Sequence, residues 1–106
     1  MPKYLFAGSY TSDGVKGLLK DGGTKRRQFV EDLVAGMGGT LEGFYYAYGD
    51  HDVYAIVDLP DNASATALSL AVNASGAVTG NLTVLITPEE VDEATRKTVN
   101  YRPPGQ

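Results

Sequence analysis

The chain has 106 residues, of which 42% are hydrophobic and 21% charged, a size and composition typical of one globular domain with a modest core. Its formal net charge of -4 argues against nucleic acid as the main partner, because phosphate contacts need a basic surface. The absence of cysteine excludes disulfides and thiolate metal sites. No stretch reaches the roughly 20 apolar residues of a membrane span, so we expect no membrane partner and a cytoplasmic protein.

The first half of the chain predicts a strand, two helical segments and a second strand. Residues 3–11 alternate in the manner of a strand, and Ser12 or Asp13 can cap a short helical turn after it. A longer helix is expected from Thr24, and glycines end it before a strand at residues 40–48. The apolar residues of this longer helix recur at intervals of three and four, which predicts one buried stripe made of Phe29, Val30, Leu33, Val34 and Met37.

The second half predicts two more strands, each followed by a helix. The Gly-Asp pair at 49–50 is typical of a hairpin connection to a third strand, which ends at residue 59. An alanine-rich helix is expected over residues 62–74 and a fourth strand over residues 81–87. A capping-box pattern then begins at Thr87, so a short acidic helix should run to about residue 98.

The order of these elements is βαββαβ, the split-βαβ or ferredoxin-like order. We therefore expect a single α+β domain with a four-stranded antiparallel sheet, strands one and three at its centre, and both main helices on one face. Residues 88–106 would add a short C-terminal helix and an extended tail to this domain.

Side-chain alternation predicts two different faces for this sheet. We expect small and aliphatic residues to dominate the helix-covered face, namely Leu5, Ala7, Tyr45, Ala47, Val53, Ala55, Val57, Leu82, Val84 and Ile86. The opposite face would then be largely aromatic, with Tyr4, Phe6, Tyr10, Phe44, Tyr46, Tyr48, Tyr54, Ile56 and Leu85. Because such a surface is too large to leave in water, we expect a homodimer or higher homo-oligomer formed sheet against sheet.

Three segments of the chain carry a family resemblance: YLFAGSYTSDGVKGLLKDGGTKRR, FYYAYGDHDVYAIVDLPD, and LITPEEVDEA with the YRPPG tail. The chain resembles the GYD-domain family, small bacterial proteins of the dimeric α/β-barrel, ferredoxin-like group. The resemblance implies that architecture and no particular activity. The naming motif falls on Gly49, Asp50, His51 and Asp52, with histidine where tyrosine is usual. Histidine can also donate a hydrogen bond and present a flat ring.

His51 and Asp58 are the candidate catalytic residues. Histidine is the side chain best suited to proton transfer near neutral pH, and a carboxylate at Asp58 would be desolvated beside the tyrosines unless it is paired. The alternatives are a turn histidine, which we favour, and an exposed strand-end aspartate. Strand alternation sends Asp50 and Asp52 away from His51, so these three residues make a poor metal site, and we expect no metal or cofactor.

Four tyrosines are the candidate ligand-binding residues. Tyr4, Tyr10, Tyr46 and Tyr54 could line a pocket between the sheet and a partner subunit, where their hydroxyls would orient a small planar or carbonyl-bearing ligand. The alternative, which we favour, is interface packing, and the two roles are compatible.

A basic cluster provides one further candidate. Lys25, Arg26 and Arg27 follow Gly22 and Gly23, where a helix start could hold a phosphate or carboxylate. We favour a solvated polar turn instead, since no fuller phosphate-loop pattern is present.

Two functions therefore remain open. The first is a small-molecule-binding or subunit-interaction module. The second is a cofactor-independent enzyme on a small aromatic or carbonyl compound, with His51 or Asp58 as acid or base.

Overall fold

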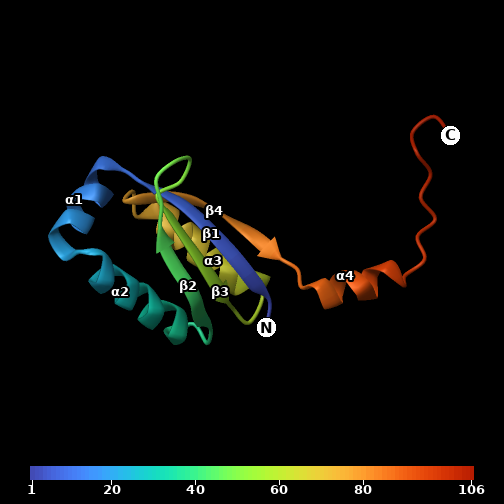
Figure 1. The fold of residues 1–106 in the computed structure, drawn as a ribbon, viewed down its shortest axis with the longest axis horizontal. Coiled ribbons are helices and arrows are strands. Elements are labelled where there is room, and N and C mark those ends of the chain that lie inside the picture. The colour runs from blue at the N-terminus through green and yellow to red at the C-terminus, as the bar shows by residue number, and fades with distance from the viewer.

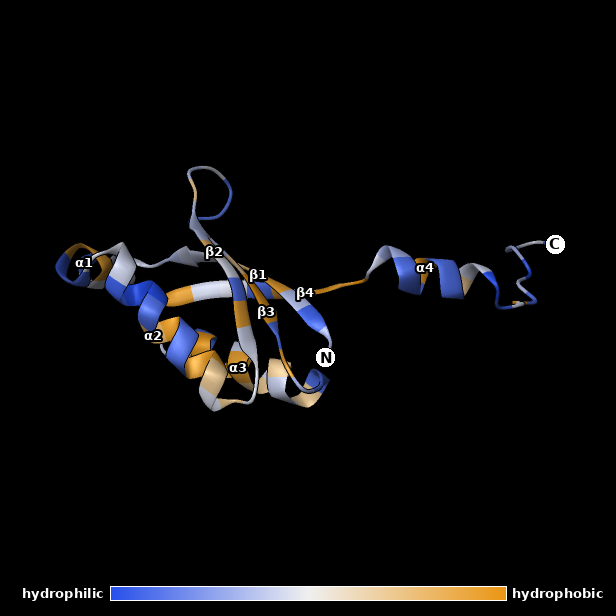
Figure 2. Cartoon of the chain, turned by 60° about the horizontal axis from the view of Figure 1, so that its bottom comes forward, coloured by the Kyte–Doolittle hydropathy of each residue, from blue (hydrophilic) through white to orange (hydrophobic).

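The computed structural model describes residues 1–106 as an α+β domain with one open, four-stranded antiparallel sheet and four helices (Figure 1). The strand order is β2-β3-β1-β4, so β1 and β3 occupy the centre, as the split-βαβ order predicts. Helices α2 and α3 lie on the same side of the sheet (Figure 2). The elements are β1 (Lys3–Tyr10), α1 (Ser12–Asp21), α2 (Gly23–Gly36), β2 (Thr40–Tyr46), β3 (Val53–Asp58), α3 (Asn62–Ala74), β4 (Val78–Leu85) and α4 (Pro88–Thr95).

Side chains cap three of the four helix starts, whereas α2 begins at Gly23, one residue before the expected Thr24, without a side-chain cap. The cap of α1 is Thr11, whose hydroxyl oxygen accepts the N–H of Gly14 at 3.3 Å, rather than Ser12 or Asp13. At α3 the Asp61 carboxylate accepts the N–H of Ser64, and this backbone hydrogen bond lowers the pKa of Asp61. The capping box that starts α4 at Thr87 is confirmed, although the helix ends at Thr95.

Strand β4 begins three residues earlier than its glycine content suggested. It pairs with β1 along the whole length of that strand, from Lys3 opposite Leu85 to Tyr10 opposite Val78. Gly80 lies inside it, and a β-carbon there would collide with the ring of Phe6. The glycine therefore makes room for an aromatic ring instead of marking a turn.

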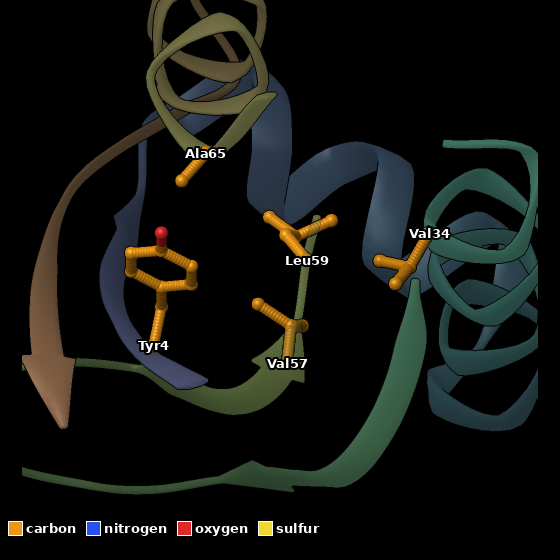
Figure 3. Close-up of a cluster of buried hydrophobic side chains, with 5 residues drawn as sticks. All are labelled: Tyr4, Val34, Val57, Leu59 and Ala65. Carbon is orange, nitrogen blue, oxygen red and sulfur yellow. The ribbon is translucent and has the colours of Figure 1, made fainter. Parts of the chain in front are cut away.

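The core lies between the sheet and the two helices α2 and α3. Tyr4 points from the sheet toward Ala65 on α3, and Leu59 lies between Val57 on the sheet and Val34 on α2 (Figure 3). Tyr4 is only 2% exposed, and its hydroxyl donates to the Asn62 side-chain oxygen at 2.5 Å, so its polar end is satisfied at the start of α3.

The faces expected for β1 and β2 are wrong. Tyr4 pairs with Val57 and Phe6 with Ala55, and directly opposed residues point to the same face, so the aromatic side of β1 lies under the helices. The residues whose predicted face is reversed are Leu5, Ala7 and Tyr45, which lie on the open face, and Tyr4, Phe6, Tyr10, Phe44 and Tyr46, which lie on the helix-covered face.

The reason for this reversal is volume. The inward side of α3 includes the small Ala65, and the space that this residue leaves above the sheet is filled by the large ring of Tyr4. Strand β3 has the expected phase, with Val53, Ala55 and Val57 inward. Tyr48 lies on neither face, because β2 ends two residues before it, at Tyr46. The side chain of Tyr48 is fully exposed.

The chain beyond β4 leaves the body of the domain (Figure 1). The radius of gyration is 17.0 Å, compared with about 13 Å for a compact chain of this length, and the longest axis measures 57 Å. None of the four helices is long and apolar enough to cross a membrane.

Replacing Leu59 by alanine should lower the free energy of unfolding by about 2–5 kcal/mol, because this side chain is fully buried and its loss leaves a cavity. Urea denaturation of the two proteins measures the difference. Leu70→Ala on α3 is the matched control, since Leu70 is 67% exposed and its truncation should change stability by less than about 0.5 kcal/mol. Equal losses in the two variants would contradict this description of the core.

Candidate functional site

An apolar cleft opens between α2, α3 and the covered face of the sheet. Its cavity volume is about 60 Å³, and every lining residue except Arg26 is apolar or aromatic. Phe6 lies across its floor beside Gly8 and Gly80, where β-carbons would strike the ring. The walls come from the expected stripe of α2, from α3 and from the sheet, and they comprise Val30, Leu33, Val34, Phe44, Val53, Ala55, Val57, Leu68, Val72 and Val78.

A second, more polar groove adjoins this cleft. Its volume is about 140 Å³, and α1 supplies one side with Asp13, Gly14, Gly17, Leu18 and Asp21. Tyr10, Arg26 and Val78 line both the cleft and the groove, and the polar groups among them belong to Tyr10 and Arg26. These two residues therefore mark the boundary between an apolar space and a polar one.

Arg26 is the cation at this boundary. Its guanidinium carbon lies 4.8 Å from the centre of the Phe29 ring, a cation–π contact that holds the side chain in place. No carboxylate pairs with it: the ion pairs of the chain are Lys3 with Glu42, Lys3 with Asp58, and Lys25 with Asp21. Of these two adjacent basic residues, Lys25 is paired with Asp21, whereas Arg26 has no carboxylate partner.

Two tyrosine hydroxyls share this boundary. Burial raises the pKa of Tyr10 to about 12, with a smaller contribution from the charge of Tyr46 and an opposing one from Arg26. Burial also raises the pKa of Tyr46, whose hydroxyl donates to the carbonyl oxygen of Gly23 at 3.1 Å. Both hydroxyls therefore stay protonated near neutral pH.

The four tyrosines expected to form one pocket are divided among three places. Tyr4 is in the core, and Tyr10 and Tyr46 are together near Arg26. Tyr54 lies on the open face of the sheet, where it is opposite Ala7. Of the four tyrosines, only Tyr10 and Tyr46 lie close together.

A sequence model of the GYD domain matches residues 4–95, which is most of the chain. The chain belongs to the GYD-domain family. No curated protein and no solved structure matches it.

The motif that names the GYD domain ties the β2–β3 connection to the end of β1. The N–H of Asp52 donates to the Gly8 carbonyl oxygen at 2.8 Å, and the Asp52 carboxylate accepts the N–H of Tyr10 at 2.9 Å. Gly49 has a φ of +145°, a value that a residue with a side chain rarely adopts. Asp52 thus fixes the backbone of Tyr10, the residue that stands at the boundary of the cleft.

His51 and Asp58 are at opposite ends of β3 in this GYD domain. The His51 ring meets Tyr54 edge to face at 5.8 Å, and its Nδ1 is buried with no hydrogen-bond partner. Asp58 accepts a hydrogen bond from Lys3 at 3.0 Å, and Lys3 also pairs with Glu42. These hydrogen bonds, the one to Glu42 first, raise the pKa of Lys3.

Neither predicted catalytic residue lines the cleft or the groove. No group of three or more histidine, aspartate or glutamate side chains converges as metal ligands. Catalytic roles for His51 and Asp58 stay predictions of the sequence.

Sequence reasoning missed the cleft because it assigned Phe6 and Phe44 to the other face. A signal was present in Gly8, since a glycine that follows an aromatic residue by two positions in a strand leaves space beside the ring on the same face. Sequence reasoning did select Arg26, although as part of a possible anion site at a helix start and not as the cation of an apolar cleft.

Tyr10→Phe should reduce the loss of stability at high pH. An unfolded tyrosine ionises near pH 10 and folded Tyr10 near pH 12, so the native state retains a proton that the unfolded state releases, and stability falls as the pH rises between these values. Denaturation midpoints measured across this range provide the test. Tyr48→Phe is the control, because Tyr48 is fully exposed, and an equal effect of both substitutions would contradict the assignment.

Proposed function

We propose that this GYD domain binds a small aromatic or short apolar molecule with one anionic or carbonyl group, and that it does so as a homodimer. The observation that supports the binding role is Arg26, a half-buried cation without an acidic partner at the junction of an apolar cleft and a polar groove. Binding sites for small molecules commonly combine apolar walls with a few convergent polar groups.

The size of the space limits the ligand. A cavity of about 150 Å³ accommodates benzene. The cleft of about 60 Å³ and the adjoining groove of about 140 Å³ together suit a molecule with a single ring or a short chain. The apolar part would lie against Phe6 and Phe44, and the polar part would face the groove.

The positive charge of Arg26 determines which polar group the ligand should carry. A guanidinium presents planar donors that fit a carboxylate in two parallel hydrogen bonds. The protonated hydroxyl of Tyr10 supplies a further donor close to Arg26, whereas the hydroxyl proton of Tyr46 is already donated to the Gly23 carbonyl oxygen. The groove also contains two carboxylates, Asp13 and Asp21, of which Asp21 pairs with Lys25. Where the groove meets the cleft, the polar groups are the donors Arg26 and Tyr10, which favour a carboxylate or a carbonyl oxygen over a cationic group.

The lining of the cleft favours binding over acid–base catalysis. It contains no histidine and no carboxylate, and its one tyrosine titrates far from neutral pH. The carboxylates of the adjoining groove, Asp13 and Asp21, are exposed, and Asp21 pairs with Lys25. The enzyme alternative depends on His51 or Asp58, which lie outside both spaces. The binding module is therefore the better supported of the two functions.

The open face of the sheet supports the homodimer. Its centre, on β1 and β3, consists of the half-buried apolar side chains Leu5, Ala7, Tyr54 and Ile56. The edge strands add Leu85 and the exposed Tyr45, together with the polar Thr79, Asn81 and Thr83 of β4. The face is less aromatic than the sequence suggested, but it is still an apolar sheet surface that no helix covers. Packing two such faces together would give the dimeric α/β barrel that the family resemblance implies.

Benzoate should bind to the full-length protein, and Arg26→Gln should weaken it about tenfold or more, because the substitution removes the charge that pairs with the carboxylate. Calorimetric titration gives the dissociation constants, and benzyl alcohol serves as the neutral analogue. The substitution should change benzyl alcohol binding by much less.

Arg27→Gln provides a matched control. Arg27 is the next residue on α2, is exposed and lines neither the cleft nor the groove beside it. Failure of benzoate to bind at millimolar concentration, or an equal loss in the two variants, would rule out this site.

Ile56→Lys should convert the dimer to a monomer, because it places a charge at the centre of the open face. Light scattering coupled to gel filtration measures the mass of the full-length protein and the variant. Leu70→Lys adds the same charge to the exposed surface of α3 and should leave the dimer intact. A wild-type protein that is monomeric at micromolar concentration would refute the homodimer.

A further inference from the structure

Residues 86–106 do not pack against the rest of the domain. Every one of them is exposed, and α4 projects from the end of the sheet away from α1 and α2 (Figure 1). This segment accounts for the excess of the radius of gyration over that of a compact chain. We call it the arm.

The arm contains a helix that is too short to be stable alone. Helix α4 has 8 residues, whereas isolated helices shorter than about 12 residues are marginal in water. Its capping box and its proline at the first turn favour the helix locally, and such a cap contributes only about 1 kcal/mol. The helix therefore needs packing contacts that its own domain does not supply.

Apolar side chains for such contacts recur along the arm. Ile86, Val91, Val99 and Tyr101 are between 51% and 78% exposed. The connection from β4 to α4 is hydrophobic where it leaves the sheet (Figure 2). A solvated tail would gain nothing from these residues, whereas a docking segment buries them.

We propose that the arm packs on a second copy of this chain, so that the two subunits exchange arms across their dimer. This inference rests on the homodimer proposed above. The arm begins directly after Leu85, which belongs to the open face, so it continues the surface on which the second copy would lie.

Size and charge both suit a second copy. A standard interface uses about 20–30 residues on each side, which the open face reaches only with the help of the arm. Helix α4 carries Glu89, Glu90, Asp92 and Glu93, and the exposed Lys16, Lys20 and Arg27 of another subunit have the opposite sign. In the arm's own subunit, α1 and the start of α2, which carry these basic residues, lie at the opposite end of the domain from α4 (Figure 1).

The test compares dimer dissociation constants of full-length proteins by sedimentation. Val91→Glu combined with Tyr101→Ser should raise the constant about tenfold or more, because both side chains are apolar anchors of the arm. Leu70→Glu, an equally exposed aliphatic residue on α3, should leave it within about twofold.

A second measurement follows the arm directly. The chain has no cysteine, so Thr98→Cys gives a single site for an environment-sensitive dye. Its emission should shift toward that of a buried dye as the concentration rises through the dissociation constant. A wild-type dimer whose constant is unchanged in the arm variant, with the dye remaining exposed, would overturn the arm exchange and leave the dimer standing. A wild-type monomer would overturn both, and benzoate binding would still test the ligand site separately.

Discussion

The pairing of β1 with β3 at the centre of the sheet is the constraint on which the rest of the domain depends. It is fixed at both ends, by Asp52 bonded to Gly8 and by the N–H of Leu59 bonded to the Pro2 carbonyl oxygen. A shift of one residue would exchange the two faces of β1. In the observed register Tyr4 enters the core, and the opposite side of the strand is left for other contacts.

The cleft is a consequence of how that core is filled. The large ring of Tyr4 meets the small Ala65 on α3, and Gly8 and Gly80 on adjacent strands leave space for the Phe6 ring. Beside the buried cluster of Tyr4 and Val34, an apolar space remains between α2, α3 and the sheet, and it ends at Arg26. The residue that bears the family motif, Asp52, acts on this region through the backbone of Tyr10. The motif thus has a structural role that is independent of the aromatic position occupied by His51.

The open face and the arm both expose apolar side chains that no other part of this small domain covers. A chain of this size buries a modest core, and association is a common way to add to it. Covering both surfaces with a second subunit would bury the apolar side chains of the face and stabilise α4 at once. The apolar cleft lies on the other side of the sheet, so the proposed subunit contacts and ligand binding would use opposite faces.

The sequence by itself determined the order of the elements, most of their bounds, the capping box at Thr87 and the family, because these depend on local periodicity and on residues close in the chain. It also determined that Tyr4, Phe6 and Tyr10 share a face. Which face that is, and hence where the candidate site lies, was decided only by the tertiary structure. Alternation has two equivalent phases, and the choice between them depends on how side-chain volumes from distant segments fill the space between sheet and helices.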